Sequence, residues 1–208
     1  KNVLAEAGVS APPKTWDEFL DACRQVKAKT GKSACAVSVD ASTIDGMIFS
    51  LGADVLDGKT TLFDSPQSIR VFELFEALAR EQLAYQIPPN SYDDRDAFAR
   101  DEVAFVFRSS SHRAPIALLM KDPAQWGMSM TPQGDPERPC TVLYGPNICI
   151  FSTTPEQQSV AWEFVKFFTS PDVSVRWALG TGYVPIRKSA AENPTMQAFW
   201  AEWEYNRA

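Results

Sequence analysis

Residues 154–190 read TPEQQSVAWEFVKFFTSPDVSVRWALGTGYVPIRKSA, and this stretch decides the fold. A Thr-Pro pair at 154–155 and a Ser-Pro pair at 170–171 each begin a predicted helix, because a hydroxyl side chain caps the first turn and proline suits the first helical position. The second helix is expected to end at Gly180 or Gly182. The stretch therefore predicts two consecutive helices followed by a loop.

The loop Thr181–Ala190 presents a tyrosine and an arginine. Gly182 permits a sharp turn, and Pro185 fixes the direction in which the chain leaves it. Tyr183 stands between them outside any periodic segment, and Arg187 follows four residues later. These two side chain types suit a polar, ring-shaped ligand, although packing against the protein is an equally good explanation for the tyrosine.

Outward from this stretch, short strands and helices alternate. Strands are predicted over 34–39, 103–107, 126–130 and 147–151. Helices are predicted from the Thr15–Glu18 capping box to Gly31, over 43–51, from Pro66 onward, over 93–100, over 113–120 and from Pro194 onward. The helix from Pro66 should hold four apolar residues on one face, Ile69, Phe72, Phe75 and Ala79. The fold class is therefore α/β, a small mixed sheet covered by many helices.

Composition excludes several kinds of protein. The chain has 208 residues, 45% hydrophobic and 12% aromatic, which is enough for one globular core or one and a half domains. Its net charge of −6, with scattered Lys and Arg, argues against nucleic acid or an anionic membrane as a partner. No apolar run is long enough to span a bilayer. Because the chain starts at Lys1 without a Met, we expect it to be processed or excised, with no signal in the chain itself.

The four cysteines and the single histidine do not form a zinc pattern, so neither a metal nor a cofactor is expected. Cys23–Cys35 and Cys140–Cys149 are two possible local disulfides. Buried free thiols are favoured, because Cys23 lies on the apolar stripe of a predicted helix and Cys149 alternates within a strand-like run. Four tryptophans are expected in the core, Trp16, Trp126, Trp162 and Trp177.

Ser109 to Arg113 place serines beside the single histidine. The side chains of adjacent residues point in different directions, so Ser111 and His112 are poorly placed to form the hydrogen bond between a nucleophile and its base. A GxSxG motif is also absent, so a serine hydrolase is disfavoured. Two interpretations remain open. Ser110 or Ser111 caps the following helix, or the turn forms a polar rim that hydrogen-bonds a ligand.

Two further positions are candidates for contact with a ligand. The turn at Tyr144–Asn147 is either an ordinary turn or a close backbone approach for which Gly145 leaves room. Asp45, in the predicted 43–51 helix, could face a pocket. Neither GxxxxGK[ST] nor GxGxxG occurs, so a nucleotide site has no support. The acidic cluster around 93–102 is expected to be a solvated face.

The order of the segments carries a family resemblance. AGVSAPPKTWDEFLDACRQVK is followed by GADVLDGKTTLFDSPQSIRVFELFEALA, FARDEVAFVFRSSSH, WGMSMTPQG and finally YGPNICIFSTTPEQQSVAWEFVKFFTSPDVSVRWALGTGYVPIRKSA. Together they resemble the family 1 extracellular solute-binding proteins of ABC importers, in the sugar and glycerol-phosphate binding group. The resemblance implies a type II periplasmic-binding-protein fold of two α/β lobes joined by crossing hinge segments. Such proteins close on a ligand in the cleft, deliver it to a membrane permease and are not enzymes.

The same resemblance divides the chain. Residues 1–123 resemble the α/β core of the second lobe, 124–170 the segment that returns to the first lobe, and 171–208 the return to the second lobe with the C-terminal helices. It implies a fragment of a two-lobe, monomeric protein that is periplasmic or extracellular, with a lipid anchor as one option.

The implied ligand contacts are Ser110, Ser111, Gly145 and Tyr183, with Arg187 a weaker carry-over. His112 and Arg113 stand where relatives often have a tryptophan, and the region of Asp45 also carries fewer tryptophans. Fewer stacking aromatics argue against a long oligosaccharide and leave a small sugar or a polyol phosphate open. The rival function is a carbohydrate-active hydrolase with Asp45 and Glu102 as its carboxylate pair, disfavoured because no catalytic motif supports it.

Overall fold

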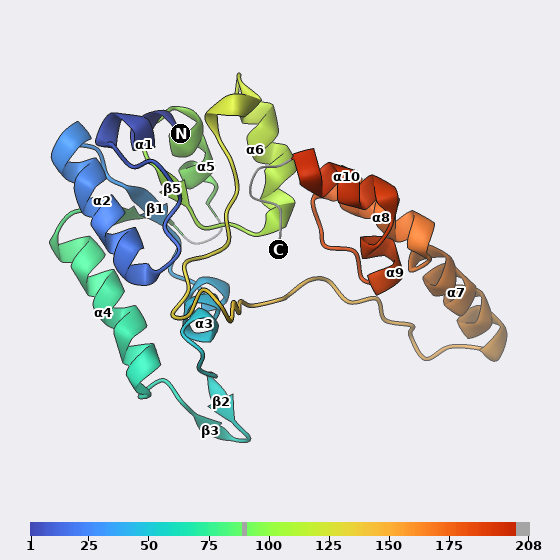
Figure 1. Cartoon of the computed structure of the whole chain (residues 1–208). Coiled ribbons are helices and arrows are strands. Elements are labelled where there is room, and N and C mark those ends of the chain that lie inside the picture. Colours follow the sequence, from blue (N-terminus) through green and yellow to red (C-terminus); the bar gives the residue numbers. More distant parts are fainter. Residues whose placement is uncertain (89–90, 203–208) are drawn as a thin grey trace. The chain divides into compact units, whose positions relative to one another are not determined.

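The structure is a computed structural model that describes residues 1–88 and 91–202. Contacts within the chain divide it into two compact units. The first unit holds Lys1–Phe107 and Leu119–Val142, and the second holds Arg108–Leu118 and Leu143–Ala208. The chain therefore passes from one unit to the other three times, and Figure 1 shows the order of its elements.

The first unit is built on a three-stranded sheet with strand order β4-β1-β5. Both strand pairs are parallel, so this sheet is not the mixed one that was predicted, and the antiparallel pair at 56–57 and 60–61 forms a separate sheet. Its strands are β1 (Cys35–Val37), β4 (Ala84–Gln86) and β5 (Phe105–Val106). In the register, Cys35 lies opposite both Ala84 and Phe105. A parallel sheet has to be covered on both faces, because its strands are joined by helical crossovers.

Helices cover the two faces of this sheet differently. Cys35 and Val37 face a large core with α1 (Asn2–Ala7), α2 (Trp16–Thr30), α3 (Ala41–Ser50) and α4 (Pro66–Arg80). Ala36, between them, faces a smaller core that includes Ala97 of α5 (Asp93–Ala99). In Figure 1, α2 and α4 lie side by side over the sheet. Alternation along β1 therefore sends its side chains to opposite cores.

Helix starts follow the capping signals in the sequence. Thr15 Oγ1 accepts a hydrogen bond from the Glu18 N–H at 3.2 Å, while the Glu18 carboxylate accepts one from the Thr15 N–H at 3.3 Å. Asp40 caps α3, and Ser65 caps α4 through the Ser68 N–H. The predicted capping box and the Ser-Pro start at 65–66 are thus confirmed.

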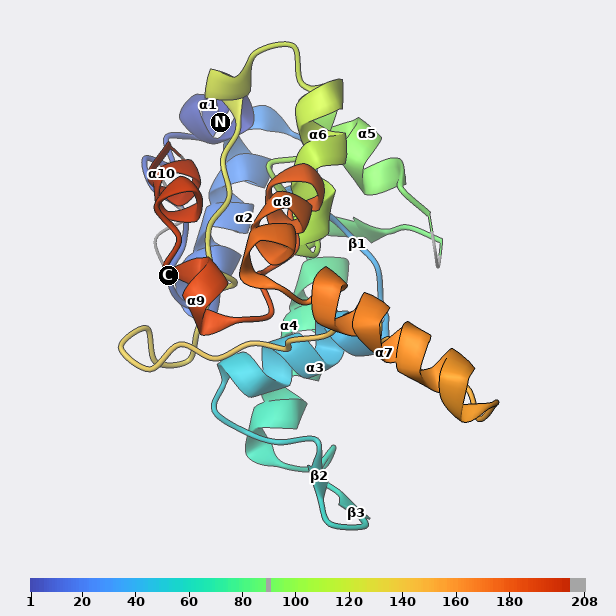
Figure 2. The same ribbon diagram turned by 90° about the vertical axis from the view of Figure 1, so that its right-hand side faces the viewer.

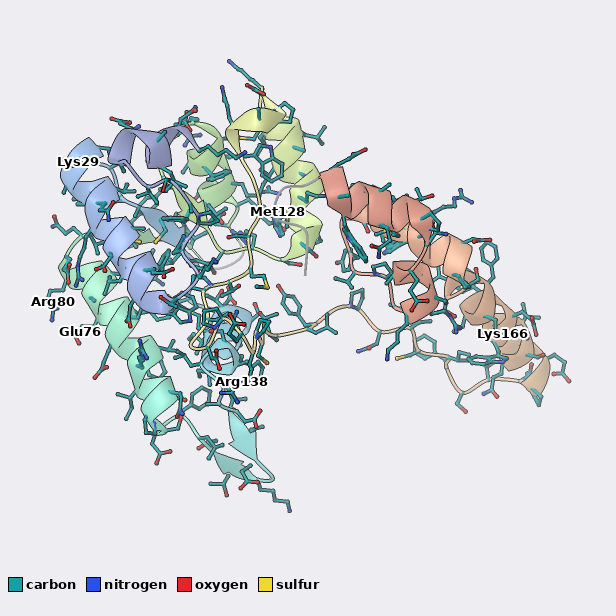
Figure 3. All side chains as sticks on the ribbon, in the orientation of Figure 1. Lys29, Glu76, Arg80, Met128, Arg138 and Lys166 are labelled. Atoms are coloured by element: carbon teal, nitrogen blue, oxygen red, sulfur yellow. The ribbon has the colours of Figure 1, made fainter. Side chains whose placement is uncertain are left out.

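Helix α4 is correctly located, but its buried face is not the predicted one. Ile69 and Phe72 are 46% and 44% exposed, whereas Val71 and Leu78 are buried. Figure 3 shows Glu76 and Arg80 together on this helix, where the Arg80 guanidinium donates to the Glu76 carboxylate at 3.4 Å. Beyond α3, β2 (Leu56–Asp57) and β3 (Thr60–Thr61) form a small antiparallel hairpin that turns at Gly58.

The second unit is helical in its described residues. It contains η1 (Ser110–His112), most of α6 (Arg113–Leu119), α7 (Pro155–Phe168), α8 (Pro171–Thr181), α9 (Lys188–Ala191) and α10 (Pro194–Glu202). Its core consists of Val175 and Ala178 of α8, Ala190 of α9 and Met196 of α10. Figure 2 shows these three helices gathered together. The helices predicted at 154–155 and 170–171 begin where expected, and the second ends at Gly182.

Two predicted strands do not form. Residues 126–130 and 147–151 lie outside every strand, and the only regular element between α6 and α7 in the described residues is the 3₁₀ turn η2 (Pro123–Gln125). Leu143 and Phe151 are each 85% exposed. An apolar run becomes a strand only where a partner edge pairs with its backbone, and none pairs with 147–151 among the described residues. Strand β4 was missed by the sequence analysis.

Burial also corrects several single residues. Trp16 and Trp126 are in the core as predicted, but Trp162 and Trp177 are 54% and 47% exposed. Cys140 and Cys149 are exposed free cysteines, not buried ones. Asp94, which the sequence assigned to a solvated face, is only 2% exposed. Each of these errors concerns which side chains of a segment face the core. Tertiary packing decides this, and the local sequence does not contain it.

Candidate functional site

Two loops that are far apart in sequence touch within the second unit. Helix α8 ends at Gly182, which has φ +77° and donates its N–H to the Ala178 carbonyl at 2.9 Å. A Cβ placed on Gly182 would lie 2.6 Å from the Ser110 carbonyl oxygen and 3.4 Å from the Ser111 Cα. The turn before α6 and the loop after α8 are therefore in direct contact. This contact brings together Ser110, Ser111 and Tyr183, which the sequence analysis had named separately.

The serine turn is held by Ser109, which the sequence analysis did not single out as the cap. Ser109 Oγ accepts a hydrogen bond from the Ser111 N–H at 3.4 Å and from the Ser111 hydroxyl at 3.2 Å. The His112 N–H donates to the Ser109 carbonyl at 2.9 Å. The prediction that Ser110 or Ser111 caps the helix is wrong by one residue, because the cap belongs to η1, which precedes α6. The sequence did contain a signal for this cap, because the Ser109 hydroxyl lies two residues before the Ser111 N–H, which needs an acceptor.

Tyr183 lies in the loop directly after the glycine. Its N–H donates to Thr181 Oγ1 at 3.3 Å, and the Thr181 hydroxyl donates to the Trp177 carbonyl at 2.7 Å. The backbone of the loop is thus tied to the last turn of α8. The tyrosine is 36% exposed and stays outside the core of the unit. A fixed backbone with a partly exposed aromatic ring is an arrangement that suits stacking against a ligand.

The two arginines near these loops make contacts within the unit. Arg113 donates from Nη2 to the Leu179 carbonyl at 3.3 Å and lies 4.5 Å above the centre of the Phe199 ring. Burial lowers the pKa of its guanidinium below the ordinary value. Arg187 donates from Nε to the Thr169 carbonyl and from Nη2 to Thr169 Oγ1 at 3.4 Å. Both guanidinium groups therefore help to hold the helices of this unit.

The remaining predicted residues are more dispersed. His112 is half-buried within η1. Gly145 lies in the irregular segment before α7, and an added Cβ would meet no atom within 4 Å. Asp45 belongs to α3 in the first unit. The structure thus groups the serines with Tyr183, and it does not bring Gly145 into contact with them.

The carboxylate pair of the rival hydrolase gains no support from its electrostatics. Glu102 accepts hydrogen bonds from Arg100 Nε at 2.7 Å and Nη2 at 3.0 Å. These bonds hold the pKa of the Glu102 carboxyl below its ordinary value. A glycosidase needs one carboxylic acid with a raised pKa to protonate the leaving group. Glu102 is therefore a poor candidate for that acid.

Two hollows lie in the first unit, and none of the predicted contact residues lines either of them. One of about 180 Å³ lies between α2 and α4, and a more open one of about 630 Å³ lies near Ser50 and Gln67. Their arginines are paired with carboxylates, Arg70 with Asp17 at 2.8 Å and Arg138 with Asp135 at 2.8 Å. Arg138 is labelled in Figure 3. Charge pairing of this kind is typical of a surface ion pair and gives no reason to place a ligand there.

Within the described ranges 1–88 and 91–202, no three His, Cys, Asp or Glu side chains group as metal ligands. Over the same ranges, every helix is too short or too polar to cross a bilayer.

Residues 1–204 match a family model described as "Bacterial extracellular solute-binding protein". Among curated relatives, the maltotriose-binding protein of Pyrococcus abyssi is 23% identical over 91% of this chain and 42% of its own length. The sn-glycerol-3-phosphate-binding periplasmic protein UgpB of Escherichia coli K12 is 21% identical over 96% of this chain and 48% of its own length. The chain therefore spans about half the length of the curated relatives it matches.

Solved structures share the fold. UgpB from Mycobacterium tuberculosis, in complex with glycerophosphocholine, superposes with a TM-score of 0.78 at 20% identity, over 99% of this chain and 53% of that one. The GacH receptor of Streptomyces glaucescens superposes with a TM-score of 0.75 at 18% identity, over 95% of this chain and 52% of that one. At these identities the likeness is one of fold, and it confirms the predicted α/β class.

Proposed function

Because its residues 1–204 match the family model, the chain belongs to the bacterial extracellular solute-binding proteins, and we propose that it forms part of the substrate-binding component of an ABC importer. The ligand is a sugar or a related polyol, held in a cleft between two lobes. The observation that carries this proposal is the contact between Gly182 and Ser110, which places a polar turn beside an exposed tyrosine.

In this proposal the two loops form one wall of the cleft. Serine hydroxyls and backbone groups at 110 and 111 would hydrogen-bond ligand hydroxyls, and the Tyr183 ring would stack on the ligand. The protein closes because the ligand makes more contacts in the closed state than in the open one. Gly145, His112, Asp45 and Arg187 are further proposed contacts with weaker support. His112 shares η1 with the serines, whereas the structure does not group Gly145, Asp45 or Arg187 with them.

A neutral ligand is favoured over a polyol phosphate. A phosphate is recognised by guanidinium groups that offer it paired N–H donors. Arg113 directs a donor at the Leu179 carbonyl and stacks on Phe199, while Arg187 directs two donors at Thr169. Both arginines therefore direct donors at partners within the protein.

We further propose that residues 1–123 and 171–208 belong to the second lobe and that 124–170 return to the first, with 203–208 outside the described residues. These lobes of the complete protein do not coincide with the two compact units of the chain. All fourteen residues of α7 are described, and none of them is buried. Val160, Phe164 and Phe167 are 57–70% exposed. An apolar helix face of this kind needs a partner, and the proposal assigns it to the half of the relatives' length that this chain does not span.

The test is calorimetric titration of the complete protein that contains this chain with maltotriose, glycerol 3-phosphate and glycerophosphocholine. We expect saturable binding of the sugar, weakened roughly tenfold by Tyr183→Ala and by less in Ser111→Ala. Phe63→Ala is the matched control, since Phe63 is an exposed aromatic of the first unit and should not change the affinity. Binding of none of the three compounds, or equal loss in the control, would contradict the proposal.

The 208-residue chain offers a second test. Because the opposite wall of the cleft is assigned to the first lobe, the isolated chain should bind these compounds much more weakly than the complete protein does. Equally tight binding by the chain alone would contradict the two-lobe division.

The hydrolase alternative makes a different prediction. Saturable hydrolysis of simple glycosides by the complete protein would favour the hydrolase and would contradict the proposed transport function. Its absence together with sugar binding supports a protein that is not an enzyme. A monomeric protein, exported to the periplasm or anchored by a lipid and working with a membrane permease, completes the proposal, and a pull-down of permease subunits with the tagged protein tests that partner.

A further inference from the structure

Cys35 and Cys23 face each other across the core of the first unit. Cys35 of β1 lies opposite Phe105 of β5, and residues paired in a parallel register point to the same face of the sheet. The Phe105 ring contacts Phe19 of α2, with centroids 5.4 Å apart. Cys23 follows Phe19 by four residues and so lies one helical turn further on the same face of α2. The helix therefore presents Cys23 to the face of the sheet that carries Cys35.

Burial places the two thiols in one packed environment. Cys23 and Cys35 are both 0% exposed and belong to the same core cluster. The cluster also contains Val26, on the same helix as Cys23, and Val37, on the same strand as Cys35. A side-chain hydrogen bond with Cys35, together with burial, raises the pKa of the Cys23 thiol above its ordinary value. The structure holds both residues as thiols.

We propose that Cys23 and Cys35 are oxidised to a disulfide when the protein folds outside the cytoplasm, and that this bond fastens α2 to the central strand of the sheet. The proposal rests on membership of an extracellular family and not on the ligand. Disulfides form and persist in extracellular and periplasmic compartments. In the reaction, each thiol loses a proton and an electron as the S–S bond forms, and a disulfide oxidant, protein or small molecule, is reduced to two thiols.

The order of events follows from the burial. A thiolate is the attacking species in thiol–disulfide exchange, and a buried thiol with a raised pKa supplies little of it. Oxidation is therefore expected before the core closes, while the cysteines are accessible. Only residues 24–34 separate the two cysteines, so the loop that has to close is short. Once folded, the protein should keep whichever state it acquired.

Peptide mapping tests the proposal without any variant. The protein is exported to the periplasm of a bacterial host, denatured in alkylating agent without reductant, and cleaved with trypsin. Cleavage after Lys14, Arg24, Lys32 and the next sites separates Cys23 and Cys35 into different peptides. We expect the two peptides to be linked and to separate on reduction. Alkylation of both cysteines, or a bond from either one to Cys140 or Cys149, would overturn the proposal.

Protein made in a reducing cytoplasm supplies the comparison. It should carry both thiols unlinked, and its thermal midpoint should be lower than that of the exported protein by about 5–10 °C, because a short loop closed by a disulfide stabilises mainly through the unfolded state. A Cys23→Ala, Cys35→Ala double variant should show no difference between the two compartments. Equal midpoints for the linked and unlinked wild-type proteins would overturn the fastening role of the bond.

Discussion

Gly182 packs against the carbonyl of Ser110 so closely that a Cβ on the glycine would lie 2.6 Å from that oxygen. The close contact requires a residue without a side chain. The backbone angle φ of +77° independently favours glycine, because other residues rarely adopt this left-handed conformation. Both requirements fall on the point where the tyrosine loop meets the serine turn.

Gly182→Ala should therefore separate the two loops. The alanine would strain the left-handed backbone and collide with a backbone atom that cannot swing away, so we expect a loss of about 1–3 kcal/mol in the free energy of unfolding. Urea denaturation of the chain measures it. Gly180→Ala is the control, because an added Cβ there meets nothing within 4 Å and the residue lies inside α8. That change should stabilise by about 0.5–1 kcal/mol, and equal effects of the two would refute the argument.

Arg113 should stabilise the second unit through its stacking and its hydrogen bond. Arg113→Lys keeps the charge but loses the planar fork that contacts Phe199 and Leu179, so we expect a loss of about 1–2 kcal/mol in the free energy of unfolding. The measurement is chemical denaturation. Arg176→Ala, an exposed arginine on α8, should stay within about 0.5 kcal/mol of the wild type. A lysine variant as stable as the wild type would show that the stacked guanidinium contributes nothing.

Ser50 should stabilise the first unit through Trp16. The Trp16 indole N–H donates to Ser50 Oγ at 2.8 Å, and both residues are buried. Ser50→Ala leaves the indole N–H without this acceptor and should cost about 1–3 kcal/mol of the free energy of unfolding. In a Trp16→Phe background the donor is gone, so the same serine substitution should cost less. A double-mutant cycle with no coupling between the two positions would count against this hydrogen bond.

Asp40 should make the stability of α3 depend on pH. Its partial burial alone would raise the pKa of the carboxyl, but hydrogen bonds from Ser42 and Thr43 outweigh burial and lower the pKa below its ordinary value of 3.8. A lowered pKa in the folded state means that the stabilisation is complete above 3.8 and is lost as the pH falls through the lower, folded value.

Asp40→Asn keeps a capping side chain but removes the titration. The stability difference between wild type and variant, measured by urea denaturation, should be constant near neutral pH and should shift against the wild type in strong acid. Curves that stay parallel down to about pH 2 would contradict this role of the carboxyl.

Local signals were the most reliable part of the sequence. The helix starts at Thr15, Ser65 and Thr154 were predicted because a capping hydroxyl and its N–H partner lie within one turn. The strand expected at 147–151 failed because a strand depends on a neighbour that the local sequence does not contain. For α4, the apolar spacing fitted more than one face, and only packing against the sheet selects Val71 over Ile69.

The candidate site shows the same limit. Tyr183 and the serines at 110 and 111 could be named because each stands out from its own surroundings and because the segment order resembles a family. Their contact could not be predicted from spacing, since it joins positions on either side of α6 and α8. The role of Arg113 depends on long-range contacts with Leu179 and Phe199 and was missed for the same reason. The Ser109 cap, in contrast, is a local contact whose signal was present in the sequence.

The second unit is assembled from two stretches of chain, and the stretch with Ser110 and Arg113 is encoded inside the sequence of the first unit. Any single recombination break between residues 118 and 143 would separate the serine turn from the tyrosine loop and give them different parents. A hybrid of this protein with a relative, joined at such a break, would take Gly182 from one parent and the carbonyl at position 110 from the other. These two groups would not have been selected to pack against each other. The two loops are therefore expected to evolve as one inherited pair, and chimeras should exchange both or neither.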